Sequence, residues 1–380
     1  MKELKKVETQ KLTGEFTNYG KEAIKKNKYG VVILSGGQGS RLKINGPKGC
    51  VLIDKGDEKQ EIFKIHVEKM QFSRIPLFIM VSRENESDTI EYFEKNNYFK
   101  DFGYNEDLIT IFEQEEWPLL KTNREKLRID GEIKYGSSGH GGFYKAISKT
   151  EVREKIDKLG IEYLYITNVD NILQRPVDLD FIGMAYKNKL DVTVKSVKKI
   201  NSQEKVGLFV EKSGKLSVLE YTEISEELSN KRDSKGELYL CEANIMTQIL
   251  SKEFIERAAK FVLPIHEQYK KKWGEEFVKR ETLLFDAFPN ADTYAVVQVS
   301  RQNEFAPIKN LHGEDSLDTA TLQYLRYLRK EEAKAKKDKE TLVDEIEILK
   351  EAFRQIKISL IKEFEDILIK IFPDYKKYLK

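Results

Sequence analysis

The chain lacks the features of a secreted, membrane-spanning or zinc-dependent protein. Its two cysteines, Cys50 and Cys241, cannot form a disulfide framework and do not have metal-ligand spacing, which suits a reducing cytoplasm. The N-terminal sequence MKELKKVETQK has no apolar core of a signal peptide, and no apolar run reaches membrane length. The four histidines are too scattered to suggest a zinc site. We therefore expect a cytoplasmic protein without a membrane partner.

A strong charge of one sign is also absent. The 380 residues include 66 Lys and Arg and 64 Asp and Glu, so the net charge is only +2 although 34% of residues are charged. This balance provides no general basic field for nucleic acid, and we expect no nucleic-acid partner. The local basic clusters at 270–272 and 329–339 are interpreted as solvated faces.

Between residue 31 and about residue 175, short apolar runs alternate with longer, helix-like polar stretches. The apolar runs are VVIL (31–34), LFIMV (77–81), ITIF (109–112) and YLYIT (163–167). Strands separated by helices predict an α/β fold with parallel strands, in which ligands bind beyond the carboxyl ends of the strands. Residues 190–250 are richer in strand patterns and predict β insertions.

The two ends of the chain have a different character. Residues 1–29 read as a helical lead-in to a catalytic domain at 30–312, and residues 313–380 read as a helical region. From 342 to 371, apolar positions recur in threes and fours, which predicts a long amphipathic helix. Such a helix either packs on the body of the protein or pairs with another chain.

The most informative stretch is VVILSGGQGSRLKINGPK at 31–48. An apolar strand leads into glycines that allow a tight turn and a close approach to a ligand, and the exposed N–H groups favour a phosphate. Arg41 and Lys48 add two cations. A plain tight turn is the alternative interpretation. Leu42 breaks the dinucleotide pattern G-x-G-x-x-G, and no Walker lysine–hydroxyl pair follows.

Two further segments carry candidate chemistry. The glycine-dense loop GSSGHGGFY at 136–144 again permits close backbone approach to a flat or anionic ligand, although it also suits a flexible loop. Asp170 in TNVDN follows the strand YLYIT directly. A carboxylate there can hold Mg²⁺ against substrate phosphates, or it can be a turn or helix-capping residue.

These segments, taken in order, resemble the eukaryotic-type UDP-sugar pyrophosphorylases, and within them most closely the UDP-N-acetylglucosamine pyrophosphorylase branch. The resemblance begins with LSGGQGSRLKINGPKG and spans roughly residues 20–310. The later blocks are GHGGFY, VDNIL, VGLF, VLEYTEIS, CEANIM, FDAF and RQNEFAPIKN. It implies a Rossmann-like nucleotide-diphospho-sugar transferase fold, a mixed sheet flanked by helices, here with β insertions and a long C-terminal helix.

The resemblance implies a uridylyltransferase. A sugar 1-phosphate, most specifically N-acetylglucosamine 1-phosphate, attacks the α-phosphorus of UTP, so that a UDP-sugar forms and pyrophosphate leaves. The implied cofactor is Mg²⁺, or Mn²⁺ in its place. The implied catalytic residues are Lys48 near the α-phosphate, Arg41 at the triphosphate and Lys309 at the sugar phosphate, with Asp170 as the metal ligand.

The resemblance also implies the binding residues. The expected nucleotide-binding residues are Ser35, Gly36, Gly37, Gly39, Gln114, Gly139 and His140, where Gln114 and the 139–140 backbone read uracil. The expected sugar-binding residues are Asn171, Gly207, Glu220 and Asn244, because a carboxylate and amides suit a hydroxyl-rich ring.

Three alternatives stay open beside this interpretation. His140 stands where the acetylglucosamine branch usually has asparagine, and CEAN precedes the sugar asparagine in place of NAGN. Both features favour an enzyme that acts on glucose 1-phosphate or on several sugar phosphates. A catalytically weakened UDP-sugar-binding protein that acts through its C-terminal helix is the second alternative. A glycosyltransferase is the third, but it predicts an Asp-x-Asp metal motif that VDN does not supply.

Overall fold

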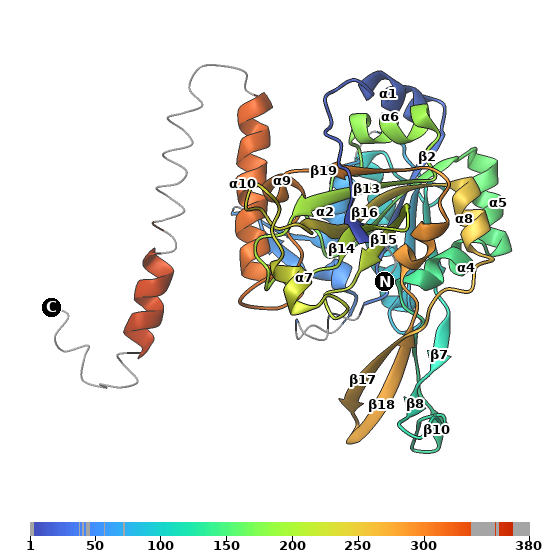
Figure 1. Cartoon of the computed structure of the whole chain (residues 1–380), viewed down its shortest axis with the longest axis vertical. Helices are drawn as coiled ribbons and strands as arrows, with labels where there is room; N and C mark the ends of the chain where they lie inside the picture. The colour runs from blue at the N-terminus through green and yellow to red at the C-terminus, as the bar shows by residue number, and fades with distance from the viewer. Residues whose placement is uncertain are drawn as a thin grey trace. The chain divides into compact units, whose positions relative to one another are not determined.

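The computed structural model describes residues 4–37, 39, 42, 46–56, 58–70, 73–335, 354 and 357–367 (Figure 1). By its internal contacts the chain divides into two compact units, Met1–Leu325 and Arg326–Lys380. The first unit carries the sheet and every candidate site residue. The predicted domain boundaries after residues 29 and 312 stay predictions.

In the described part of the first unit, ten strands form one mixed sheet. β6, β5, β2 and β12 run parallel to one another, and β13 and β19 form a second parallel pair. β16 lies between β12 and β13 and is antiparallel to both. The strands are β1 (Leu4–Lys6), β2 (Tyr29–Leu34), β5 (Leu77–Val81), β6 (Ile109–Glu113), β12 (Tyr163–Asn168), β13 (Val192–Lys198), β14 (Leu208–Lys212), β15 (Lys215–Leu219), β16 (Glu242–Ser251) and β19 (Tyr294–Gln298). The predicted mixed α/β class is confirmed.

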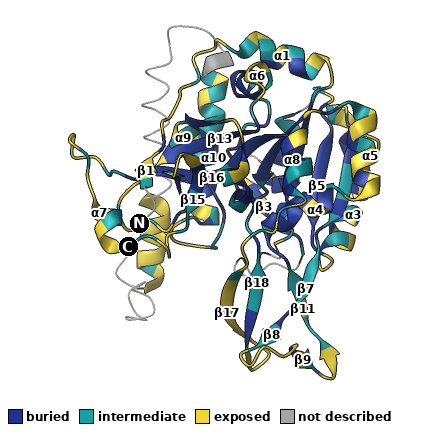
Figure 2. Cartoon of the chain, turned by 45° about the vertical axis from the view of Figure 1, so that its right-hand side comes forward, coloured by how far each residue is buried: buried dark blue, intermediate teal, exposed yellow. Residues whose placement is uncertain are grey.

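The central strands are buried on both faces, which explains their uninterrupted apolar sequences. In β2, Val32 and Leu34 belong to one large core cluster, while Val31 and Ile33 are also buried, on the opposite face. Figure 2 shows the strands as buried and the flanking helices as buried on one face and exposed on the other. This pattern is that of amphipathic helices covering a sheet.

Helices connect the strands and cover the sheet. The described helices of four or more residues are α1 (Thr17–Lys25), α2 (Ile62–Glu68), α3 (Glu86–Lys95), α4 (Phe143–Ile147), α5 (Thr150–Leu159), α6 (Leu179–Asn188), α7 (Glu226–Asn230), α8 (Lys252–Ala258), α9 (Arg301–Glu304) and α10 (Leu317–Ala335). Short 3-10 helices lie at η2 (Lys48–Cys50), η3 (Asn97–Phe102), η4 (His140–Gly142) and η5 (Leu284–Asn290).

The N-terminal segment is more than a helical lead-in. Besides α1 it contributes β1, which pairs antiparallel with β14 at the edge of the sheet. α1 packs closely on α6, because a Cβ added at Gly20 would lie 1.9 Å from the carbonyl oxygen of Leu179. The Asp180 carboxylate of α6 accepts hydrogen bonds from the backbone N–H groups of Gly14 and Phe16, at 2.7 Å each. These bonds satisfy backbone donors just before the first turn of α1.

A small β arm extends from the body (Figure 1). It is built from two distant segments, because β18 (Glu275–Glu281) pairs with both β17 (His266–Lys272) and β8 (Leu120–Lys121). β7 (Glu116–Pro118) pairs with β11 (Tyr135–Ser137), and β9 (Arg128–Ile129) pairs with β10 (Glu132–Ile133). The 190–250 strands, predicted as insertions, instead belong to the main sheet, and the arm comes from segments outside that range. One further hairpin joins β3 (Leu52–Asp54) and β4 (Lys59–Glu61).

The second unit bears on the predicted C-terminal helix. Residues 357–367 are helical, and their apolar side chains Ile358, Leu360, Ile361, Phe364 and Ile367 are exposed. The rest of the helix predicted over 342–371 lies outside the described residues, except for residue 354.

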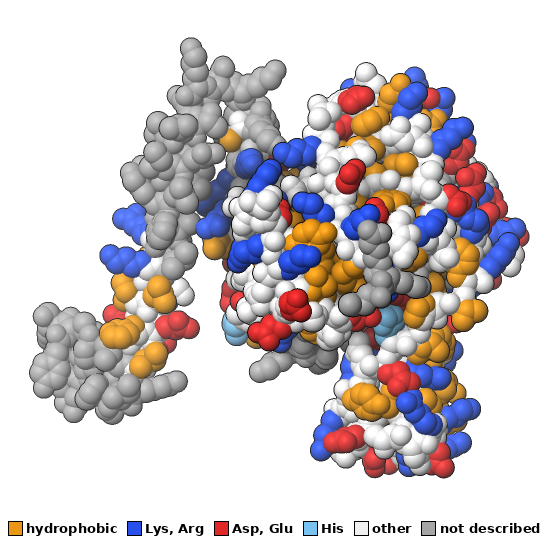
Figure 3. All heavy atoms as spheres, viewed as in Figure 1, with side chains coloured by type: hydrophobic (Ala, Val, Ile, Leu, Met, Phe, Trp, Pro, Cys, Tyr) orange, Lys and Arg blue, Asp and Glu red, His pale blue; other side chains and the backbone are white. Residues whose placement is uncertain are grey.

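None of the described helices is long and apolar enough to cross a membrane. Figure 3 shows acidic and basic side chains interspersed on the face in view.

Candidate active site

The candidate residues of the glycine loop and of the VDN segment follow neighbouring parallel strands. Leu34 at the end of β2 pairs with Asn168 at the end of β12, and the Val169 N–H donates to the Leu34 carbonyl at 3.1 Å. Ser35 and Asp170 therefore start from adjacent points on one edge of the sheet. This edge is where open α/β sheets bind their ligands.

Buried hydrogen bonds fix the start of the glycine loop. The Ser35 N–H donates to the Met80 carbonyl at 2.8 Å, and the Asn85 side chain donates to the Ser35 carbonyl at 2.7 Å. Asn85 also accepts from the Ser82 N–H at 2.9 Å, so its amide joins the ends of β2 and β5. The sequence analysis did not identify Asn85, because its role depends on a contact with Ser35 across 50 residues.

The predicted uracil-binding glutamine lies against the same loop. Gln114 directly follows β6, and its N–H donates to the Val81 carbonyl at 2.9 Å. A Cβ added at Gly36 would lie 2.0 Å from Gln114 Nε2. Glycine is therefore required at position 36 for the Gln114 side chain, which is only 4% exposed, to keep its place. The structure brings these two predicted nucleotide-binding residues together.

Lys48 and Asp170, predicted at the α-phosphate and the metal, form an ion pair. Lys48 Nζ lies 2.9 Å from Asp170 Oδ2, and the two side chains are only 13% and 16% exposed. The backbone at Gly49 packs against the fully buried Phe63, because an added Cβ would lie 2.2 Å from its ring. Gly49 thus allows the chain to hold Lys48 beside the sheet edge.

The surroundings of Asp170 suit a magnesium ion that substrate oxygens help to bind. Among the described residues, no three His, Cys, Asp or Glu side chains are grouped to hold a metal by themselves. Mg²⁺ commonly binds one or two carboxylates and completes its shell with water and phosphate oxygens. A single carboxylate beside a loop that the sequence predicts to bind phosphate fits this chemistry.

A buried histidine supports the segment that carries Asp170. His66 Nε2 lies 2.8 Å from the Val169 carbonyl oxygen, and the Gln174 side chain lies 3.0 Å from His66 Nδ1. Burial lowers the pKa of His66 to about 3, so the ring stays neutral. It can then donate from Nε2 and accept at Nδ1. His66 was dismissed at the level of sequence, because a lone histidine carries no signal of such a contact.

The VDN segment is joined to the segment that carries Lys309. The Asn171 amide donates to the Glu304 carbonyl at 2.8 Å, and its Oδ1 accepts from the Ala306 N–H at 3.0 Å. The Ile308 N–H donates to the Asp170 carbonyl at 3.0 Å. Asn171 is buried and its amide is used by the backbone, so its contact with a sugar stays a prediction.

Lys309 itself is half exposed near this junction. Its Nζ lies 2.8 Å from Asp315 Oδ2, and the side chains are 37% and 39% exposed. An exposed ion pair of this kind adds little stability, so the lysine can exchange its partner at low cost. Lys309 can therefore exchange Asp315 for an anionic ligand.

The GHGG loop packs tightly against η5. Gly139 has a φ of +82°, and an added Cβ would lie 2.5 Å from the Thr282 carbonyl oxygen. His140 Nδ1 accepts a hydrogen bond from the Leu284 N–H at 2.8 Å. Burial lowers the pKa of His140 to about 4, so the ring is neutral and carries its proton on Nε2. The loop thus offers a tight backbone turn and one uncharged hydrogen-bond donor, the Nε2–H group of His140.

Three of the four predicted sugar-binding residues meet at one place. A Cβ added at Gly207 would lie 2.8 Å from the Glu220 carboxylate, and the Asn244 N–H donates to the Gly207 carbonyl at 2.8 Å. Burial raises the pKa of Glu220. Asn244 Oδ1 accepts from the Met246 N–H, and Met246 has a φ of +53° at an irregular point of the β13–β16 pairing. Such irregularities often aim side chains at binding sites.

Not every candidate can be placed. Arg41 lies outside the described residues. Gly37 is exposed and Gly39 has a φ of +57°, as expected of a loop that turns tightly. The predicted nucleotide-side group around Gly36 and the predicted sugar-side group around Gly207 are both attached to strands of the same mixed sheet.

Comparison with known proteins gives a consistent result. The sequence model of the family described as UTP–glucose-1-phosphate uridylyltransferase matches residues 1–371. A UDP-N-acetylglucosamine pyrophosphorylase of Saccharomyces cerevisiae is 32% identical over 347 residues, which cover 83% of this chain and 72% of the yeast protein.

Two solved structures are similar as well. A candidate UDP-N-acetylglucosamine pyrophosphorylase of Entamoeba histolytica superposes with a TM-score of 0.79 at 29% identity, over 85% of this chain and 88% of that one. A uridine diphosphate N-acetylglucosamine pyrophosphorylase of Trypanosoma brucei, solved with an inhibitor, gives a TM-score of 0.74 at 30% identity, over 81% and 67%.

Proposed function

Because the chain belongs to the UTP–glucose-1-phosphate uridylyltransferase family, a family of UDP-sugar pyrophosphorylases, we propose that it makes UDP-N-acetylglucosamine. The substrates are UTP and N-acetylglucosamine 1-phosphate, and the second product is pyrophosphate. The observation that carries this proposal is the Lys48–Asp170 ion pair beside the glycine loop and Gln114. In this proposal the cation Lys48, the carboxylate Asp170, the 35–39 loop for the phosphates and the Gln114 amide for the base share one edge of the sheet.

The reaction requires little covalent chemistry from the protein. An oxygen of the sugar phosphate attacks the α-phosphorus of UTP, and the bond from that phosphorus to the β-phosphate bridging oxygen breaks. Phosphoryl transfer of this kind is accelerated mainly by positioning and by neutralising charge. The backbone at 35–39 binds the triphosphate, Lys48 donates to the α-phosphate, and Lys309 leaves Asp315 to bind the sugar phosphate.

Asp170 has two partners in this scheme. In the structure it neutralises Lys48, whose Nζ lies 2.9 Å from Asp170 Oδ2. With Lys48 donating to a phosphate oxygen of the substrate, Asp170 would be the residue that holds Mg²⁺. The metal, or Mn²⁺ in its place, supplies Lewis-acid stabilisation of negative charge on the phosphates.

The sugar is bound by the group around Gly207. Glycine at this position leaves space for the Glu220 carboxylate, and Asn244 presents its Nδ2 group from β16. Hydrogen bonds to sugar hydroxyls discriminate strongly, because a wrong sugar leaves buried polar groups unpaired. His140 favours a second candidate, in which glucose 1-phosphate or several sugar phosphates are used, because its Nε2 proton replaces an amide in the GHGG loop.

The test is UDP-sugar formation from UTP and Mg²⁺ with each of three sugar phosphates: N-acetylglucosamine, glucose and galactose 1-phosphate. A strong preference for the first supports the proposal. Comparable rates, or a preference for a plain hexose, support the second candidate. If the chain binds UDP-sugar but turns over none of the three sugar phosphates, both enzyme candidates are contradicted. The chain is then a UDP-sugar-binding protein.

We also propose that the C-terminal helix pairs with a second copy of the chain. Within residues 357–367 apolar side chains recur at spacings of three and four, the pattern of helices that pair along an apolar stripe. Light scattering of the full chain and of a chain truncated after Lys330 tests this directly. The full chain should be a dimer and the truncated chain a monomer that still turns over UTP. A monomeric full chain contradicts the pairing.

A further inference from the structure

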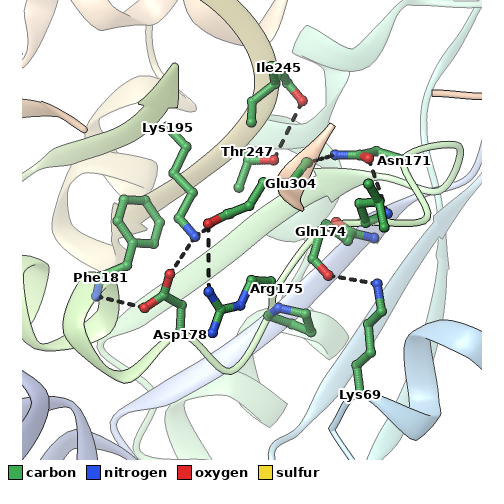
Figure 4. Close-up of polar contacts among 12 residues, drawn as sticks. Lys69, Asn171, Gln174, Arg175, Asp178, Phe181, Lys195, Ile245, Thr247 and Glu304 are labelled. Atoms are coloured by element: carbon green, nitrogen blue, oxygen red, sulfur yellow. Dashed lines mark hydrogen bonds and ion pairs between the residues drawn. The ribbon is translucent and has the colours of Figure 1, made fainter. Parts of the chain in front are cut away.

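A lysine is fully buried beneath the candidate active site. Lys195 lies in β13 and is 0% exposed. Its Nζ lies 2.6 Å from Asp178 Oδ2 and 2.6 Å from Glu304 Oε2 (Figure 4). The Phe181 ring lies over the same ammonium group, with its centroid 4.8 Å away. Strand β13, the start of α6 and the end of α9 therefore meet at the Lys195 ammonium group.

Cations and carboxylates meet in this cluster. Arg175 approaches Glu304 at 4.0 Å, and Lys69 also interacts electrostatically with Glu304. Burial alone would raise the pKa of Asp178, but Lys195 and Arg175 hold it below its usual value. Taking such charges out of water is costly, and hydrophobic residues of similar volume often serve stability as well or better. The cluster therefore calls for a reason other than stability.

Glu304 gives that reason, because it starts the segment that reaches the active site. Its carboxylate is fixed by Lys195, while its carbonyl accepts from the Asn171 amide at 2.8 Å. Along residues 304–309, Ala306 donates to Asn171 at 3.0 Å and Ile308 donates to Asp170 at 3.0 Å. The next residue is Lys309.

We infer that Glu304 is a positioning residue: its carboxylate, held by Lys195, fixes the 304–309 segment and thereby the relative places of Asp170 and Lys309. This inference rests on the proposed function, in which these two residues bind the metal and the sugar phosphate. A rigid support of this kind matters because a small displacement of a positioning group costs up to about 100-fold in rate.

The chain provides a matched pair of variants. Glu304→Gln and Asp178→Asn each remove one carboxylate from Lys195 and leave the other, and both lost contacts are 2.6 Å long. Only Glu304 belongs to the segment that carries Lys309. Both replacements keep the side-chain volume, whereas Lys195→Met would take from two buried carboxylates the ammonium group that they share and endanger folding.

Two measurements separate positioning from general stability. In Glu304→Gln, kcat for UDP-sugar formation should fall by about 10- to 100-fold with the KM for UTP unchanged, since the glycine loop is not part of the cluster. Native-state hydrogen exchange of the Ala306 and Ile308 amides should be about 10-fold faster. In Asp178→Asn, kcat and the exchange rates of the Ala306 and Ile308 amides should stay near wild type. This holds even if its melting temperature falls as far as that of Glu304→Gln.

The outcomes are distinguishable from failure of the proposed function. Equal losses of kcat in the two variants, or unchanged exchange of the Ala306 and Ile308 amides in Glu304→Gln, overturn the inference. A wild-type chain without turnover overturns the proposed function instead. In that case hydrogen exchange still decides whether Glu304 fixes the 304–309 segment.

Discussion

Replacement of Lys48 by methionine is the sharpest test of the proposed mechanism, because the same lysine is assigned to the substrate and to Asp170. The variant keeps the apolar stem of the side chain and removes the ammonium group that lies 2.9 Å from Asp170 Oδ2. Loss of one preorganised donor to a developing phosphate charge lowers kcat by about 10²- to 10³-fold. The fold should persist with a modest loss of stability.

The stability cost follows from the geometry of the pair. Both side chains are mostly buried but lie at the edge of the sheet, so Asp170 can regain water when its partner is lost. Loss of this charge-assisted hydrogen bond should cost about 1–2 kcal/mol. At an unfolding entropy of about 2.1 cal/mol/K per residue, this corresponds in the unit Met1–Leu325 to a fall in melting temperature of about 1.5–3 °C. A larger fall would mean that the rate was lost through unfolding.

The Mg²⁺ dependence of the rate gives a second test, because two variants should shift its midpoint in opposite directions. In the wild type, Lys48 and the metal compete for Asp170, so Lys48→Met should lower the Mg²⁺ concentration at half-maximal rate. Asp170→Asn, which removes the ligand, should raise it. UDP-sugar formation is followed by anion-exchange chromatography, so that no coupling enzyme adds its own metal requirement. Midpoints that move in the same direction in both variants would refute the competition.

Three further outcomes are expected. Gly36→Ala should raise the KM for UTP by about 10-fold, because the new Cβ would lie 2.0 Å from Gln114 Nε2 and displace the base-reading amide; an unchanged UTP titration contradicts that role. Gly49→Ala should destabilise the chain by about 1–3 kcal/mol in a thermal melt, since its Cβ would lie 2.2 Å from the buried Phe63 ring; an unaltered melt means that the ring moves freely. His140 has a folded-state pKa lowered to about 4, so it adds stability above its unfolded pKa of about 6.5 that is lost as pH falls toward 4. His140→Asn should reduce the fall in melting temperature over that range while the part due to His66 remains, and a curve parallel to wild type would sink the assignment.

The nucleotide side of the site could be predicted largely from local patterns. The apolar runs that end at Leu34 and Thr167 identify strands, and parallel strands place Ser35 and Asp170 on one edge of a sheet. The structure confirms that arrangement through the Leu34–Asn168 register. The assignment of Gln114 to the nucleotide came from the family resemblance and not from spacing, and its contact with Gly36 is visible only in the structure.

The β arm escaped prediction because its pairing is not local. β17 has an exposed, strongly charged sequence that reads as a solvated face, and its residues are indeed mostly exposed. It is a strand because β18 pairs with it on one side and with β8 on the other, across more than a hundred residues. Strand propensity depends on such neighbours, so a single sequence cannot supply the information.

The burial of Lys195 is the feature that a single sequence predicts least well. In VTVKSVK it looks like a polar position on an alternating strand, which predicts a solvated side chain. β13 is instead buried on both faces, since it lies between β16 and β19 and is covered from either side. The lysine is tolerated there only because Asp178 and Glu304, from 17 and 109 residues away, both reach its ammonium group. A buried charge that breaks the local pattern, and that needs distant partners to be stable, identifies a place where the fold has been constrained by function. That is why the residues supporting the site had to be found in the structure, although those touching substrate could be proposed from the sequence.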